Sequence, residues 1–123
     1  MKLLKTMRLL AVVFFITACA ANAQEKTSEG AQKITDMMKE QLKLNNDQYK
    51  KVYAVNEDFL KQAKAMKESG AGRKEKVQKF KDIDAKRDEK LKGILSKEQY
   101  ASFLEHKKEN RQKLREYFKD QQG

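Results

Sequence analysis

Side chains that could carry out catalysis or bind a metal are few in this sequence, and they lie far apart. His106 is the only histidine and Cys19 is the only cysteine among the 123 residues. A tight zinc site takes about four ligands, most of them Cys or His, so a single His makes such a site unfavourable. No candidate serine nucleophile has a histidine beside it in the sequence to activate it. These serines are Ser28, Ser69, Ser96 and Ser102.

Two further patterns that could do chemistry lack the residues they need. Gly70 and Gly72 are not followed by the rest of a phosphate-binding loop. Asp82 and Asp84 are interleaved with lysines, as carboxylates on an exposed helix face are. We therefore expect a protein that is not an enzyme and that has no catalytic residue, no cofactor and no metal.

The charge balance indicates a binding role instead. The chain has 28 Lys and Arg residues against 18 Asp and Glu residues, which gives a net charge of +10. A chain this basic attracts acidic partners, which include nucleic acid, membrane surfaces and acidic protein segments. The length allows one small domain, and the absence of proline argues against a turn-rich β fold.

The first 23 residues have the order of a secretory signal peptide. Basic residues open the segment, an apolar run follows over residues 9–18, and small residues stand at Ala21 and Ala23. The run is well short of the roughly 20 apolar residues that span a bilayer, so a transmembrane anchor is the weaker interpretation. We predict a signal peptide over residues 1–23 and one mature domain over residues 24–123, outside the cytosol, with a net charge of +7. Nucleic acid is not an expected partner there.

Cys19 allows a second interpretation of the same segment. The run Ile16-Thr17-Ala18-Cys19 resembles the bacterial lipobox, in which the cysteine is lipidated and becomes the new N-terminus. We favour cleavage after Ala23, which removes Cys19 together with the signal. The alternative is a protein anchored in the envelope by a lipid on Cys19, and the mass of the mature N-terminus distinguishes the two.

The mature chain shows apolar residues at helical steps of three and four, and no segment alternates long enough to be a strand. The expected helices cover roughly residues 29–41, 46–69, 73–92 and 97–119. We expect the glycines of Ser69–Gly72, and also Gly93, to end helices, because glycine tolerates the left-handed conformation.

The apolar stripes of these helices are narrow. Val77 and Leu104 belong to the stripes of the third and fourth helices, and Arg87 occupies a stripe position in the third. A chain of about 100 residues with thin stripes buries little surface on its own. We therefore expect an all-α fold of elongated helical hairpins, with about four helices, completed by dimerisation. A compact monomeric bundle is the alternative.

One six-residue pattern occurs twice, each time at the start of an expected helix. The copies are Leu44-Asn45-Asn46-Asp47-Gln48-Tyr49 and Leu95-Ser96-Lys97-Glu98-Gln99-Tyr100. Asn45 and Ser96 are favourable N-caps, and a glutamine follows each of them at the position that a capping box requires. The leucine before each cap, Leu44 or Leu95, can pack on the next turn as a hydrophobic staple. The pattern predicts a structural role for Leu44, Asn45, Gln48, Leu95, Ser96 and Gln99.

The two copies resemble the Leu-Thr-x-x-Gln motif of the Spy/CpxP-like periplasmic proteins of Gram-negative bacteria. Asn45 and Ser96 stand where that motif has threonine, and both can still cap a helix. The resemblance implies a cradle-shaped antiparallel homodimer in the periplasm, with ATP-independent chaperone activity or a role in envelope-stress sensing. Some relatives bind metals through His-rich segments, and this sequence has none.

The distribution of basic residues leads to the hypothesis of a client-binding surface. The excess of basic residues lies after Gly70, in stretches 73–92 and 107–119, and would attract acidic, partly unfolded chains. Methionine and other apolar side chains could then hold a client loosely. The candidates are Met37, Met38, Tyr53, Leu60, Met66, Arg73, Lys74, Lys76 and Arg87. Core filling by the methionines and a merely solvated basic face are the simpler alternatives.

Two other functions stay open at this stage. One is an envelope adaptor, with or without a lipid anchor. The other is an inhibitor of stress signalling that docks on the extracytoplasmic domain of a membrane sensor. A single specific partner in a pull-down, in place of broad client protection, would favour the inhibitor.

Overall fold

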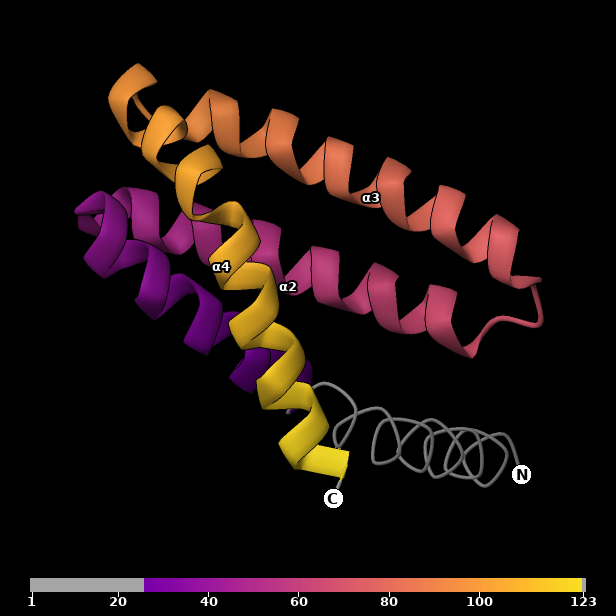
Figure 1. Ribbon diagram of the computed structural model, residues 1–123. Coiled ribbons are helices and arrows are strands. Elements are labelled where there is room, and N and C mark those ends of the chain that lie inside the picture. Colours follow the sequence, from indigo (N-terminus) through magenta and orange to yellow (C-terminus); the bar gives the residue numbers. More distant parts are fainter. Residues whose placement is uncertain (1–25, 123) are drawn as a thin grey trace, which may run out of the picture.

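The computed structural model describes residues 26–122, and over this range the chain forms four helices and no strand (Figure 1). The first helix occupies residues 26–42. It is followed by α2 (Asn46–Glu68), α3 (Arg73–Ile94) and α4 (Lys97–Gln122). The prediction of an all-α fold is confirmed. The predicted signal peptide and Cys19 lie outside the described residues.

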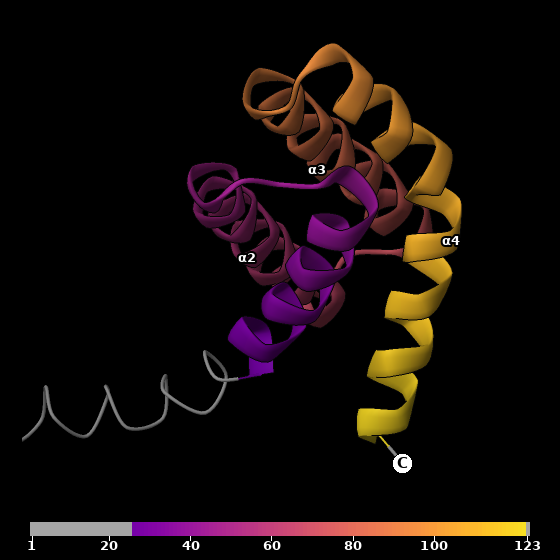
Figure 2. The ribbon, with the colours of Figure 1, turned by 90° about the vertical axis from the view of Figure 1, so that its left-hand side faces the viewer.

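The helices α2 and α3 form a long antiparallel hairpin, which confirms the predicted hairpin architecture (Figures 1 and 2). The first helix packs on α2, where Thr35 and Asn56 are hydrogen bonded. The last helix, α4, crosses α3 and also reaches the first helix through a bond between Asn110 and Gln41. The dimer is not tested by this single chain and stays a prediction.

All four helices contribute to one core. The largest fully buried apolar side chains are Phe103, Met38, Leu91 and Val52. Ile34, Phe59 and Leu60 belong to the same cluster. Two stripe assignments are wrong, because Val77 is 50% exposed and Leu104 is 48% exposed. Neither side chain belongs to the core cluster, so these two stripe positions stay in contact with solvent.

The helices do not end in the left-handed glycine conformation that the sequence predicted. None of the described glycines has a positive φ, and α2 ends at Ser69 in an extended conformation with φ −68° and ψ 153°. Gly93 lies inside α3, which continues to Ile94. The left-handed residue is instead Lys43, with φ 55° after the first helix. The Leu44 N–H then donates to the Lys39 carbonyl at 3.3 Å, the six-to-one bond of a Schellman motif.

Because Gly93 is helical and a Cβ built there would have no atom within 4 Å, we expect Gly93→Ala to stabilise the protein. The gain should be about 0.5–1 kcal/mol, since alanine loses less backbone entropy on folding. Urea unfolding measures it, with Ala85→Gly at an exposed position of the same helix as the reverse control. A loss of stability in Gly93→Ala would instead support the left-handed conformation that the sequence suggested.

Candidate functional site

Both repeated patterns form capping boxes, which confirms their predicted role as helix starts. The Asn45 side chain accepts from the Gln48 N–H at 2.8 Å, and the Gln48 side chain accepts from the Asn45 N–H at 3.2 Å. The second copy repeats this with Ser96 and Gln99, at 3.1 Å and 2.9 Å. Each box satisfies two N–H groups that a helix start otherwise leaves without partners.

The two boxes are also joined to each other, which the sequence analysis did not predict. Gln48 Nε2 donates to Gln99 Oε1 at 2.7 Å, and Gln99 Nε2 donates back to Gln48 Oε1 at 3.1 Å. The same two amide nitrogens reach the ends of the other helices. Gln99 donates to the Leu42 carbonyl at 3.1 Å, and Gln48 donates to the Ile94 carbonyl at 3.3 Å. One network therefore holds the ends of all four helices.

The rest of the motif supports this junction. Leu44 and Leu95 are both buried in the core cluster, in agreement with their predicted staple role. The Tyr49 hydroxyl donates to the Asp36 carboxylate of the first helix. This hydrogen bond, together with partial burial and the negative charge of Asp36, raises the pKa of Tyr49 to about 12.

A cluster of charged side chains fixes α4 to α3. Lys107 Nζ lies 2.7 Å from Asp84 and 2.6 Å from Asp88, and Arg111 lies 2.8 Å from Asp84. Burial opposes the ionisation of Asp84, but the hydrogen bond from Lys107 and the nearby cations outweigh it. The hydrogen bond and the cations therefore hold the pKa of Asp84 below its ordinary value of 3.8. Asp84 is therefore an ionised, structural carboxylate at neutral pH.

Arg87 belongs to this same seam and is half-buried, and its predicted client-binding role stays a prediction. Its guanidinium carbon lies 4.4 Å from the centre of the Phe59 ring and 5.7 Å from that of Phe103. Burial lowers the pKa of Arg87, and the charges of Asp84 and Asp88 act in the opposite direction. The position of Arg87 on the apolar stripe of the third expected helix correctly indicated a side chain that lies between helices.

Two of the predicted client-binding residues are in the core. Met38 is 1% exposed and Leu60 is 6% exposed, so neither can contact a client on the surface. This corrects their assignment, and the physical reason is that Met38 of the first helix and Leu60 of α2 belong to the core cluster that the helices share. Met37, Tyr53 and Met66 are half-buried, while Arg73 and Lys74 are exposed.

Two polar pairs lie between helices, and the sequence analysis missed both. Gln41 and Asn110 exchange side-chain hydrogen bonds at 2.8 Å in each direction. Asn56 donates to Thr35 Oγ1 at 3.1 Å, and both residues are fully buried. A signal was present for Asn56, because it stands one turn after Val52 on the apolar stripe of α2.

One serine does lie close to the histidine in the folded chain. Ser102 and His106 are one helical turn apart in α4, and Ser102 Oγ lies 3.4 Å from His106 Nδ1. That nitrogen lies closer, at 2.8 Å, to the Ser102 carbonyl oxygen, which can only accept. Nδ1 therefore carries the proton and cannot take one from the Ser102 hydroxyl.

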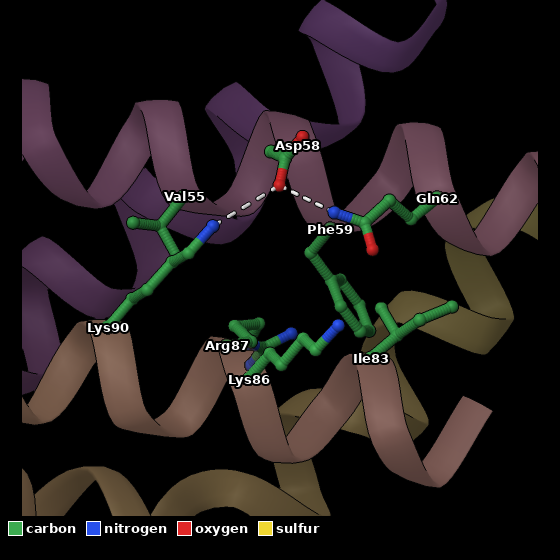
Figure 3. Close-up of a pocket in the computed structure, with 8 residues that line it drawn as sticks. All are labelled: Val55, Asp58, Phe59, Gln62, Ile83, Lys86, Arg87 and Lys90. Atoms are coloured by element: carbon green, nitrogen blue, oxygen red, sulfur yellow. Dashed lines mark hydrogen bonds and ion pairs between the residues drawn. The ribbon is translucent and has the colours of Figure 1, made fainter. Parts of the chain in front are cut away.

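The described residues offer little enclosed space. A pocket between α2 and α3, lined by Val55, Phe59 and Arg87 among others, has a volume of about 10 Å³, room for about one water (Figure 3). Asp58 at its rim accepts from Gln62 at 2.7 Å and pairs with Lys90 at 3.5 Å. Over residues 26–122 there is no cluster of three His, Cys, Asp or Glu side chains suited to a metal, and no helix long and apolar enough to cross a membrane.

Comparison with known proteins identifies a family whose function is unknown. Residues 18–103 match DUF4890, a domain of unknown function, and this protein belongs to that family. The matched region contains both capping boxes and the whole α2–α3 hairpin. No curated protein and no solved structure matches the chain. The resemblance to the Spy/CpxP-like proteins stays a prediction.

The paired glutamines should be coupled in stability. We expect Gln48→Ala and Gln99→Ala each to lower the free energy of unfolding by about 1–2 kcal/mol, since each removes a cap contact and an interhelical bond. The double variant should lose about 1 kcal/mol less than the sum, because the second change finds the pair already broken. Urea unfolding of the four proteins gives the cycle. Gln78→Ala, on an exposed helix face, is the control, and strictly additive losses would contradict the coupling.

The charged seam should weaken in acid. The folded pKa of Asp84 is below its unfolded value, so its contribution is present above about pH 4 and is lost as the pH falls through the folded pKa. We expect Asp84→Asn to cost about 1–3 kcal/mol at pH 7 and progressively less below pH 4. Unfolding at several pH values measures this difference. Glu75→Gln, in an exposed pair with Lys79, is the control, and a pH-independent cost for Asp84→Asn would refute the assignment.

Proposed function

We propose that this protein is an ATP-independent, chaperone-like protein of the bacterial periplasm that binds unfolded or aggregation-prone proteins on an open helical surface. One observation carries the proposal. The described surface combines cations that have no carboxylate partner with half-exposed apolar side chains, and the one pocket described there is water-sized. Such a surface suits loose binding of many sequences better than recognition of one small molecule.

The electrostatic part of the proposal rests on the cations that have no carboxylate partner among the described residues. Lys107 and Arg111 are paired with Asp84 and Asp88 inside the seam. Arg73 and Lys74 are exposed on α3 and have no carboxylate within ion-pair distance among the described residues. Free cations of this kind raise the encounter rate with acidic chains over about a Debye length, near 8 Å at physiological salt.

The apolar part of the proposal is a set of weak contacts. Val77 and Leu104 are each about half exposed, and Met37, Tyr53 and Met66 are half-buried. Covering a half-exposed valine or leucine gains about 1 kcal/mol. A few such contacts hold a client for a short time and release it without ATP. The periplasmic location, the dimer and the stress response follow from the resemblance and are part of the proposal.

Aggregation of an unfolding model protein tests this function directly. The protein from Gln24 onward should delay light scattering by the client at low salt and protect less at high salt, because salt screens the basic surface. Absence of protection at low salt would refute the chaperone function. Protection that is equal at both salt concentrations would refute only the electrostatic part.

A matched pair of variants tests the apolar part. Val77→Ser with Leu104→Ser removes the two exposed apolar side chains and should reduce protection, with little change in stability. Ala65→Ser with Ala101→Ser alters exposed positions of α2 and α4 and should leave protection unchanged. Equal protection by both variants would contradict a role for these apolar side chains.

A further inference from the structure

The end of the α2–α3 hairpin has a net positive charge almost as large as that of the whole predicted mature chain. We define the hairpin end as residues 61–81, which include the last two turns of α2, the connection and the first two turns of α3. This segment has eight Lys and Arg residues and two Glu residues, a net charge of +6. Residues 24–123 together have a net charge of +7. The rest of the mature chain is therefore close to neutral.

Few of these cations are compensated by the fold. The basic residues are Lys61, Lys64, Lys67, Arg73, Lys74, Lys76, Lys79 and Lys81. Lys61 and Lys79 pair with glutamates one turn away, and Lys76 donates to the Lys67 carbonyl at the end of α2. Lys64, Arg73, Lys74 and Lys81 are exposed and have no ion pair among the described residues.

The shape of the hairpin end indicates what kind of anion it fits. It extends past the first helix and α4, so it can approach a flat surface before these two helices do (Figure 1). Its cations lie on both helices, and no described pocket lies among them. A dispersed set of cations matches many phosphates spread over a plane better than a single shaped ligand.

We propose that the hairpin end docks on an anionic phospholipid surface. Clusters of four to eight Lys and Arg residues on a helix are typical of such binding, and lysine stems can lie along the interface while the ammonium groups reach phosphates. Val77, half exposed between Arg73 and Lys81 on the α3 surface, adds a small apolar contact. The binding is peripheral, since no described helix is suited to cross a membrane. It goes beyond client binding and does not depend on it.

Cosedimentation with vesicles tests the docking. The protein from Gln24 onward should sediment with vesicles of equal parts phosphatidylcholine and phosphatidylglycerol, and not with pure phosphatidylcholine. Each basic residue near an anionic surface changes partitioning about fivefold, so neutralising three should weaken it about a hundredfold. The variant is Lys64→Gln, Lys74→Gln and Lys81→Gln. The control neutralises three exposed lysines at the opposite end of the molecule, two near the start of α2 and one at the start of α4: Lys50→Gln, Lys51→Gln and Lys97→Gln.

The outcomes separate docking from client binding. Loss of sedimentation in the hairpin-end variant, with retention in the control, supports the proposal. Equal sedimentation of both variants overturns it, and so does equal binding to pure phosphatidylcholine. If the hairpin-end variant loses protection of an aggregating client while vesicle binding is unchanged, the hairpin end belongs to a client surface and the membrane proposal is wrong.

Discussion

The reciprocal hydrogen bonds between Gln48 and Gln99 are the constraint on which the arrangement of this protein depends. Each glutamine closes a capping box on its own helix, and each also reaches the carbonyl end of another helix, at Leu42 or Ile94. Because side-chain amides have both donors and acceptors, two residues can satisfy both helix junctions at once. The four helices are therefore tied together at one end of the molecule, and the α2–α3 hairpin projects from that end.

Polar groups between the helices then determine how each helix lies. The first helix is aligned by the Thr35–Asn56 contact with α2 and by the Gln41–Asn110 pair with α4. The charged seam around Asp84 aligns α4 with α3. Buried charges contribute little net stability, since their desolvation offsets much of their attraction, but an unmatched charge in the same place costs more. A shifted packing of α4 would leave Asp84 unpaired, so the seam disfavours alternatives more than it stabilises the native fold.

The sequence predicted the features that depend on neighbouring residues and missed those that depend on distant ones. The helices and both capping boxes were predictable, because spacings of three and four residues generate them. The bond between Gln48 and Gln99 joins positions 51 residues apart, and nothing local indicates it. Met38 and Leu60 were assigned to the surface because their neighbours, the first helix and α2, could not be placed from the pattern. Lys43 takes a left-handed conformation that favours glycine, so the residue type at this position did not indicate that conformation.

The placement of charge separates two kinds of basic residue. Lys107, Arg111 and Arg87 lie against carboxylates and aromatic rings, where their positive charge is used within the fold. The lysines of the hairpin end instead lie close to one another on α2 and α3, and their like charges repel. Such repulsion lowers stability, and it falls on the part of the hairpin with the least buried core, where Val77 is half exposed. Lys61 and Lys79 are paired with glutamates, but Lys64, Arg73, Lys74 and Lys81 have no ion pair among the described residues. The proposed anionic surface would compensate this charge, which the fold leaves largely unpaired.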